Sequence, residues 1–185
     1  MKNKPLKFSV IKNHSKKQWI LFITGIIAII IGISVLGFFG ARKIYRELQM
    51  QKMLHENVVI EIPDIKIKAP VAEGIDNKTL SKTTGHFPGT GNVGIGNYCI
   101  AGHSSIIYKE YFNNLKNIEI GMEINLYDLN DKKYVYTVAE NFIVEPNESW
   151  ILNDFGDNRI TLITCTDDGK QRQVVVGIMK QESIH

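Results

Sequence analysis

Acidic side chains are absent from the first 46 residues: Glu47 is the first of the 19 Asp and Glu in the chain. Nine of the 22 Lys and Arg lie in that acid-free stretch, so the rest of the chain carries 13 basic and 19 acidic residues although the whole has a net charge of +3. A nucleic-acid-binding module needs its positive charge on the folded part, so this class of partner is excluded. Only five residues are proline, and 22% charged and 9% aromatic residues exclude general disorder.

Charged residues are also absent from Ile20 to Phe39, a run of twenty that would span about 30 Å as a helix, the thickness of a bilayer core. The run is longer than the apolar part of a cleaved signal peptide, which favours a retained signal anchor. Six Lys precede it and three basic residues follow it, so the positive-inside rule places the N-terminus in the cytoplasm. We therefore expect a cytoplasmic segment over residues 1–18, one transmembrane span over residues 19–40, and the remainder outside the cell membrane.

The pattern changes twice after the span. Residues 41–57 are polar, lack Pro and Gly, and space their apolar residues loosely as in a helix, which predicts a stalk. From Val58 onward, short runs of β-branched and aromatic residues alternate with turn residues. Seven or eight such runs in about 125 residues predict an all-β domain over residues 58–185, a closed or nearly closed barrel with short helices.

Few residues suited to nucleophilic or acid–base chemistry lie in the predicted barrel. Its two cysteines, Cys99 and Cys165, fit either a disulfide, the common state in an exported protein, or a nucleophile assisted by a base. Two of the five histidines, His86 and His103, fall among the predicted strands. His86 lies in a Gly- and Pro-rich loop, and we expect it on the surface. His103 follows the run YCIA, and strand ends are where a rigid scaffold presents reactive groups.

Cys165 and Arg172 are predicted to face each other. Cys165 ends the run RITLITC, Arg172 begins RQVVVGIM, and the six residues between them contain an Asp-Gly turn signal. In an antiparallel hairpin of simple register the two Cβ atoms would lie about 5 Å apart. Arginine stays protonated and cannot act as a base, but it favours a neighbouring thiolate and can hydrogen-bond an oxyanion. An imidazole in reach, such as that of His103, could transfer the protons.

These residues resemble those of the sortases, the membrane-anchored cysteine transpeptidases of Gram-positive bacteria. The segment TLITC, Thr161–Cys165, is similar to the family's TLxTC signature, and AGH, Ala101–His103, is similar to its catalytic-histidine strand. Arg172 follows at the interval of the short-loop members. The resemblance runs from about Val58 to Lys180 and is closest to class D or class A. It implies a sortase-like closed barrel of seven or eight strands behind one N-terminal transmembrane helix.

The resemblance also implies a reaction. Cys165 would attack the carbonyl of the Thr in an LPxTG-type C-terminal sorting signal of a surface protein, His103 would transfer protons, and Arg172 would hold the carbonyl or oxyanion. The thioacyl-enzyme would then pass the protein to an amine of a cell-wall precursor such as lipid II, or to a pilin lysine in pilus-building members. Three further residues are expected to contribute to substrate binding: Ala101, Trp150 and Thr164, the last through the oxyanion hole.

No cofactor is expected. Some sortases bind calcium, and loop carboxylates are its preferred ligands, but a solvated acidic surface is the favoured interpretation of Asp154, Asp157, Asp167 and Asp168. A membrane-tethered binding module with a Cys99–Cys165 disulfide remains an alternative. Two other cysteine enzymes of the cell wall are disfavoured: TLITC lacks the Ser and Gly of L,D-transpeptidases, and a papain-like enzyme would place its Cys before its His.

Overall fold

The computed structural model describes residues 16–104 and 111–180. Its longest helix, α1 (Lys16–Glu56), runs through both the predicted span and the predicted stalk. Among the described residues α1 is the one helix long and apolar enough to cross a membrane, and its large apolar side chains are exposed over the charge-free run. Most of the predicted cytoplasmic segment lies outside the described residues. The chain divides between Gln49 and Met50 into a helical unit and a barrel unit.

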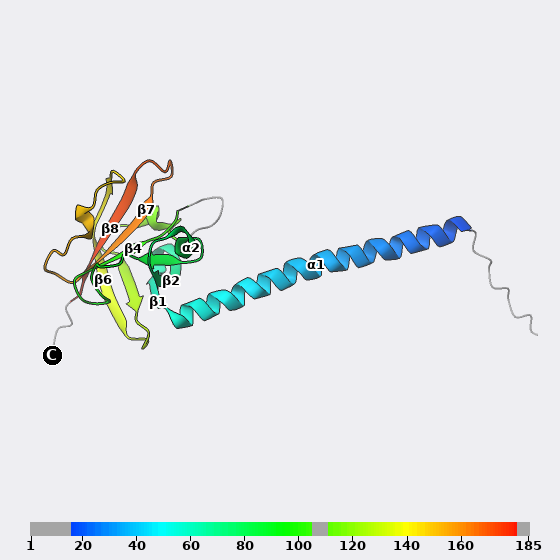
Figure 1. The fold of residues 1–185 in the computed structure, drawn as a ribbon, viewed down its shortest axis with the longest axis horizontal. Helices are drawn as coiled ribbons and strands as arrows, with labels where there is room; N and C mark the ends of the chain where they lie inside the picture. Colours follow the sequence, from blue (N-terminus) through cyan, green and yellow to red (C-terminus); the bar gives the residue numbers. More distant parts are fainter. Residues whose placement is uncertain (1–15, 105–110, 181–185) are drawn as a thin grey trace, which may run out of the picture. The chain divides into compact units, whose positions relative to one another are not determined.

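Eight strands in the described part of the chain close into one barrel, in the order β1, β2, β3, β4, β7, β8, β6, β5 (Figure 1). This confirms the predicted architecture. The strands are β1 (Val58–Ile62), β2 (Ile67–Glu73), β3 (Thr84–His86), β4 (Asn97–Ala101), β5 (Glu123–Tyr127), β6 (Lys133–Val144), β7 (Arg159–Cys165) and β8 (Arg172–Met179). The short helices are η1 (Pro63–Ile65), α2 (Asn77–Leu80), η2 (Leu115–Asn117) and η3 (Trp150–Leu152).

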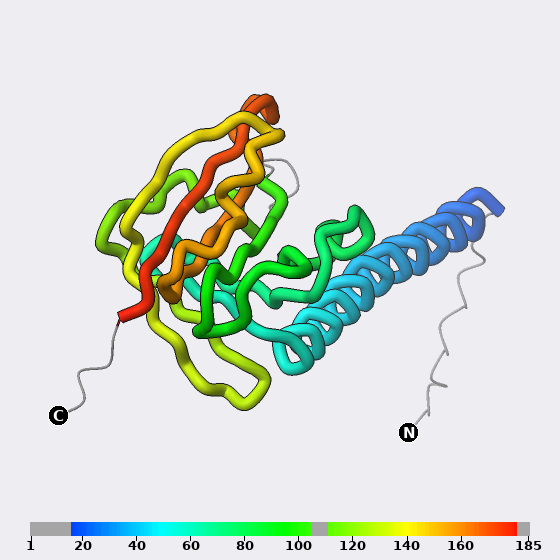
Figure 2. Tube along the Cα trace, turned by 60° about the vertical axis from the view of Figure 1, so that its left-hand side comes forward, coloured from blue at the N-terminus to red at the C-terminus, as the bar shows by residue number. Residues whose placement is uncertain are grey.

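The pairing of β4 with β7 joins segments that are far apart in the sequence. These two strands are parallel, with Ala101 opposite Ile163, whereas β7 and β8 form an antiparallel hairpin. β8 in turn pairs antiparallel with β6. Four strands therefore lie side by side in the order β4, β7, β8, β6. In two views the β7/β8 turn, coloured orange to red, lies at one end of the barrel and the β5/β6 turn at the other (Figures 1 and 2).

The two faces of this four-stranded surface have different roles, because successive side chains of a strand point to opposite sides. The inner side chains join the main core: Tyr98, Ile100, Ile160, Leu162 and Val175 are buried there with residues from the other strands. The outer side chains pack in a second apolar cluster. Its buried members are Ile151, Ile163, Val174 and Val176. Because Ile151 comes from η3, the β6/β7 connection covers part of the outer face.

Candidate active site

The three residues predicted to be catalytic meet at one edge of the outer face. Cys165 ends β7 and pairs with Arg172 at the start of β8, in the register predicted from the hairpin. Ala101, the last paired residue of β4, lies opposite Ile163 of β7. His103 follows Ala101 by two positions and Cys165 follows Ile163 by two positions, so the same register brings His103 level with Cys165. Gly102 extends this register, since its N–H donates to the Ile163 carbonyl at 3.1 Å. His103, Cys165 and Arg172 are each half-buried. The register places Cys165 and Arg172 side by side on β7 and β8, and His103, just beyond the end of β4, in the same row.

The segment that carries His103 is fastened to the strand that carries Cys165. The buried Thr164 hydroxyl donates to the Gly102 carbonyl at 2.8 Å. A Cβ atom at position 102 would lie 2.5 Å from Cδ2 of Phe112, so this close approach requires glycine. The Phe112 N–H donates to the His103 carbonyl at 3.2 Å. Main-chain contacts on both sides of the histidine therefore set its position.

Arg172 is held by the turn that precedes it. Its Nη1 donates to the carbonyls of Gln171, at 3.0 Å, and Gly169, at 3.4 Å. Gly169 has a φ of 72°, so the predicted Asp-Gly turn signal is realised. The Thr166 N–H donates to the Gln171 carbonyl at 3.0 Å and closes the turn. A guanidinium has five donors, so these contacts leave others for a carbonyl oxygen beside Cys165.

Cys99 and Cys165 are both free thiols. Cys99 lies opposite Thr161, four residues before Cys165 along β7, which places the two cysteines about 13 Å apart along the sheet. A disulfide needs Cα atoms within about 7 Å. The Cys99–Cys165 disulfide considered from the sequence is therefore corrected: the barrel register keeps the two sulfur atoms apart.

The two thiols should differ in reactivity. Cys99 is fully buried, and burial raises its pKa to about 11, so it stays protonated at neutral pH. We expect iodoacetamide at pH 7.5 to alkylate Cys165 in the folded protein and Cys99 only after denaturation, as read by peptide mass spectrometry. Similar labelling rates for both cysteines in the folded protein would contradict this placement.

His86 is buried, which corrects the expectation that it lies on the surface. It ends β3, where its ring stacks on Tyr98 with centroids 4.3 Å apart. Its Nδ1 lies 2.7 Å from the Glu73 carboxylate, and its Nε2 lies 3.0 Å from both the Gly91 carbonyl and the Thr90 hydroxyl. The Nε2 contacts hold the loop after β3 and the Nδ1 contact joins the end of β2, so both ring nitrogens have a structural role.

The other predicted site residues occupy different places. Ala101 is half-buried on the outer face of β4, and its partner on β7 is Ile163, two residues before Cys165. Trp150, in η3, is 45% exposed, and its ring stacks on Phe142 with centroids 5.8 Å apart and an interplanar angle of 6°. Thr164 differs from the expectation, because its hydroxyl hydrogen is donated to Gly102 inside the fold. The hydroxyl therefore has a structural role, and a contribution of Thr164 to the oxyanion hole stays a prediction.

The four loop carboxylates considered for calcium each have partners in the protein. Asp154 accepts from the Gly156 N–H, Asp157 pairs with Arg159, Asp167 pairs with Lys116, and Asp168 accepts from the Thr166 hydroxyl. Within residues 16–104 and 111–180, no three His, Cys, Asp or Glu side chains gather as metal ligands would. The expectation that the protein needs no cofactor stays a prediction.

Comparison with known proteins agrees with this geometry. Residues 60–180 match the Sortase domain. The chain is 32% identical over 120 residues to Sortase A of Bacillus anthracis, covering 64% of this chain and 57% of that protein. It is 32% identical over 123 residues to Sortase A of Streptococcus agalactiae, covering 63% and 49%. It thus spans about half the length of these curated relatives.

Solved structures give the same result. The Sortase D5 transpeptidase of Clostridium perfringens is 30% identical, with a TM-score of 0.62 over 73% of this chain and 89% of that one. A lid mutant of Sortase A from Corynebacterium diphtheriae is 27% identical, with a TM-score of 0.63 over 69% and 72%. The eight-stranded barrel with its row of His, Cys and Arg is that of a sortase, and the chain belongs to the sortase family.

Proposed function

We propose that this protein is a cysteine transpeptidase that cleaves an LPxTG-type C-terminal sorting signal after its threonine and joins the surface protein to an amine of a cell-wall precursor such as lipid II. The observation that carries the proposal is the row formed by His103, Cys165 and Arg172, whose register is fixed by the pairing of β4, β7 and β8. A thiol flanked by an imidazole and a guanidinium suits acyl transfer.

In the proposed reaction Cys165 lies between its two assistants, His103 and Arg172. The Cys165 thiolate attacks the threonine carbonyl carbon, and the oxygen gains negative charge beside the Arg172 guanidinium. As the peptide C–N bond breaks, His103 gives a proton to the leaving amine, and a thioester remains on Cys165. An incoming amine then loses its proton to His103 and attacks the thioester, which expels the Cys165 thiolate. The imidazolium is restored, and the enzyme returns to its starting state.

The experiment that tests this proposal is mass spectrometry of the full chain with LPxTG and LPxTA peptides. We expect a covalent adduct on Cys165 with the mass of the peptide up to its threonine. Adding an amine that mimics a lipid II side arm should convert the adduct to the amide. A lysine-containing pilin peptide tests the alternative acceptor, because the similar structures include a pilus-related Sortase C of Group B Streptococcus. No adduct with any peptide would overturn the proposal.

The proposed membrane topology can be tested separately. The charge-free run within α1 and the excess of basic residues before it support an uncleaved anchor with the N-terminus in the cytoplasm and the barrel outside. Protease treatment of intact protoplasts should therefore degrade the barrel while a cytoplasmic marker survives. Protection of the barrel in protoplasts, with digestion after lysis, would refute this topology.

A further inference from the structure

The η3 segment, residues 150–153, covers the outer face next to the catalytic row. Ile151 is buried in the cluster with Ile163 and Val174. Trp150 remains 45% exposed and stacks on Phe142, whose register partner on β8 is Val174. Because Val174 lies two residues after Arg172, this aromatic pair is placed on the Arg172 side of the face. The η3 segment thus presents an exposed indole beside the row that performs the proposed chemistry.

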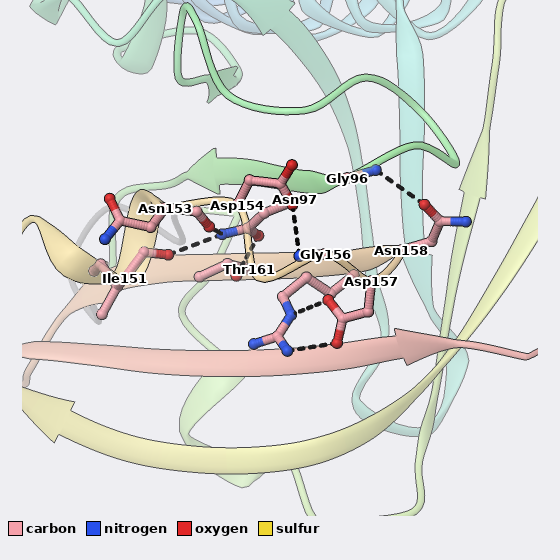
Figure 3. A network of polar contacts seen from close by, with 10 residues as sticks. Gly96, Asn97, Ile151, Asn153, Asp154, Gly156, Asp157, Asn158 and Thr161 are labelled. Atoms are coloured by element: carbon pink, nitrogen blue, oxygen red, sulfur yellow. Dashed lines mark hydrogen bonds and ion pairs between the residues drawn. The ribbon is translucent and has the colours of Figure 1, made fainter.

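One buried side chain ties the η3 segment to the sheet. Asn97, only 1% exposed at the start of β4, donates through Nδ2 to the Ile151 carbonyl at 3.0 Å and to the Asn153 carbonyl at 2.9 Å. Its Oδ1 accepts from the buried Thr161 hydroxyl at 2.7 Å. Figure 3 shows the carboxamide of Asn97 between the segment and Thr161. The amide orientation is unambiguous because both backbone carbonyls can only accept.

These three bonds resist displacement of the segment. A buried donor left without an acceptor costs more than the net gain from one ordinary hydrogen bond. If the η3 segment moved away from the sheet, both amide hydrogens of Asn97 would lose their partners. Its carboxamide would also stay fixed in direction by Thr161. The segment is therefore held in one place before any peptide arrives, and preorganisation of this kind lowers the cost of binding.

We infer that Asn97 is a positioning residue: it holds the η3 segment, and with it the Trp150 side chain, in the place where the substrate peptide binds. It therefore affects peptide binding and not the chemical step. The inference rests on the proposed function, because it assigns the segment to the same peptide site. Asn97 lies on the same face of β4 as Ala101 but at the opposite end of the strand from His103. Its effect on the reaction must therefore pass through the η3 segment.

The test uses the full chain with Trp19→Phe, which leaves Trp150 as its single tryptophan. In this background Asn97→Ala should increase acrylamide quenching of the Trp150 fluorescence about twofold or more. The loss of two bonds should raise KM for the sorting peptide about tenfold, with kcat within about threefold of the parent. Asn114→Ala is the matched control: its carboxamide also holds a backbone carbonyl, that of Ile65 at 3.0 Å, but not the η3 segment. It should change neither readout.

Unchanged quenching and KM in folded Asn97→Ala would overturn the inference, as would a loss of kcat at constant KM. If Asn97→Ala does not fold, Thr161→Val and Thr161→Ser decide. The valine removes the hydroxyl that orients the carboxamide and should raise quenching and KM, whereas serine should restore both. If the parent processes no sorting peptide, the proposed function fails, but the quenching comparison still decides whether Asn97 positions Trp150.

Discussion

Replacing Cys165 by alanine is expected to abolish thioacyl formation and to lower transpeptidation by about four orders of magnitude or more, as loss of a catalytic nucleophile does. The physical reason is that no other thiol can reach the row of His103 and Arg172, since Cys99 is buried on β4, four residues before His103. The measurement is the rate of amide product by mass spectrometry, together with the mass of the enzyme after incubation with peptide alone.

Cys99→Ala provides the matched control for that experiment. It removes a thiol from the same sheet, so it reports any effect of cysteine loss on folding. We expect it to lower stability slightly, because a buried sulfur leaves a small cavity, and to keep most of the activity per folded molecule. Comparable losses in the two variants would argue against Cys165 as the single nucleophile.

His103→Ala and Arg172→Ala should each reduce transpeptidation by at least about two orders of magnitude, the usual effect of removing a proton-transfer group or an oxyanion donor. Arg172→Lys should not restore full activity, because an ammonium cannot reproduce the planar fork that contacts the turn carbonyls and still faces Cys165. Initial rates at saturating peptide, measured on protein shown to be folded by circular dichroism, provide the comparison.

His86→Ala is the control that separates chemistry from structure. Because His86 is buried against Tyr98 and Glu73, its loss should lower the melting temperature, yet the folded fraction should retain most of its turnover. Near-normal turnover of folded His103→Ala, combined with an inactive but folded His86→Ala, would mean that His86 transfers the protons and His103 does not. The sortase fold itself would be unaffected by that outcome.

The local patterns of the sequence predict the parts of this site that are local in the chain. The observed register confirms the hairpin that places Cys165 opposite Arg172. The sequence predicts it because six intervening residues with an Asp-Gly signal leave few alternative registers. The barrel is likewise confirmed, since short strand-like runs at close spacing need a closed sheet. The hairpin prediction depends on one short segment of the chain, and the barrel prediction depends on the number of strand-like runs and not on which strands pair.

The misjudged residues depend on partners distant in the chain. His86 looked exposed because its loop is rich in Gly and Pro, but Glu73 and Tyr98 from neighbouring strands enclose it. The separation of Cys99 from Cys165 depends on the parallel register of β4 and β7, which no local pattern reveals. Thr164 lies next to Cys165 in the sequence, yet strand alternation turns its side chain to the other face, where its hydroxyl binds the Gly102 carbonyl.

Asn97 was missed, although the sequence does contain a signal for it. In NYCIAGH the alternation of a strand places Asn97, Cys99 and Ala101 on one face, together with His103. An asparagine on the face that carries a proposed catalytic residue could have been singled out. Its acceptors could not, because they are backbone carbonyls more than fifty residues away.

The parallel pairing of β4 with β7 also determines when the site can form. Thr164 and Gly102, which join the two strands, are 62 residues apart. Closing that loop therefore costs about 4 kcal/mol of chain entropy before the pairing contributes any stabilisation. Contacts of such high sequence separation slow folding. A growing chain that has completed β4 but not β7 contains His103 but lacks Cys165. The row of His103, Cys165 and Arg172 can therefore be completed only after seven of the eight strands have been synthesised.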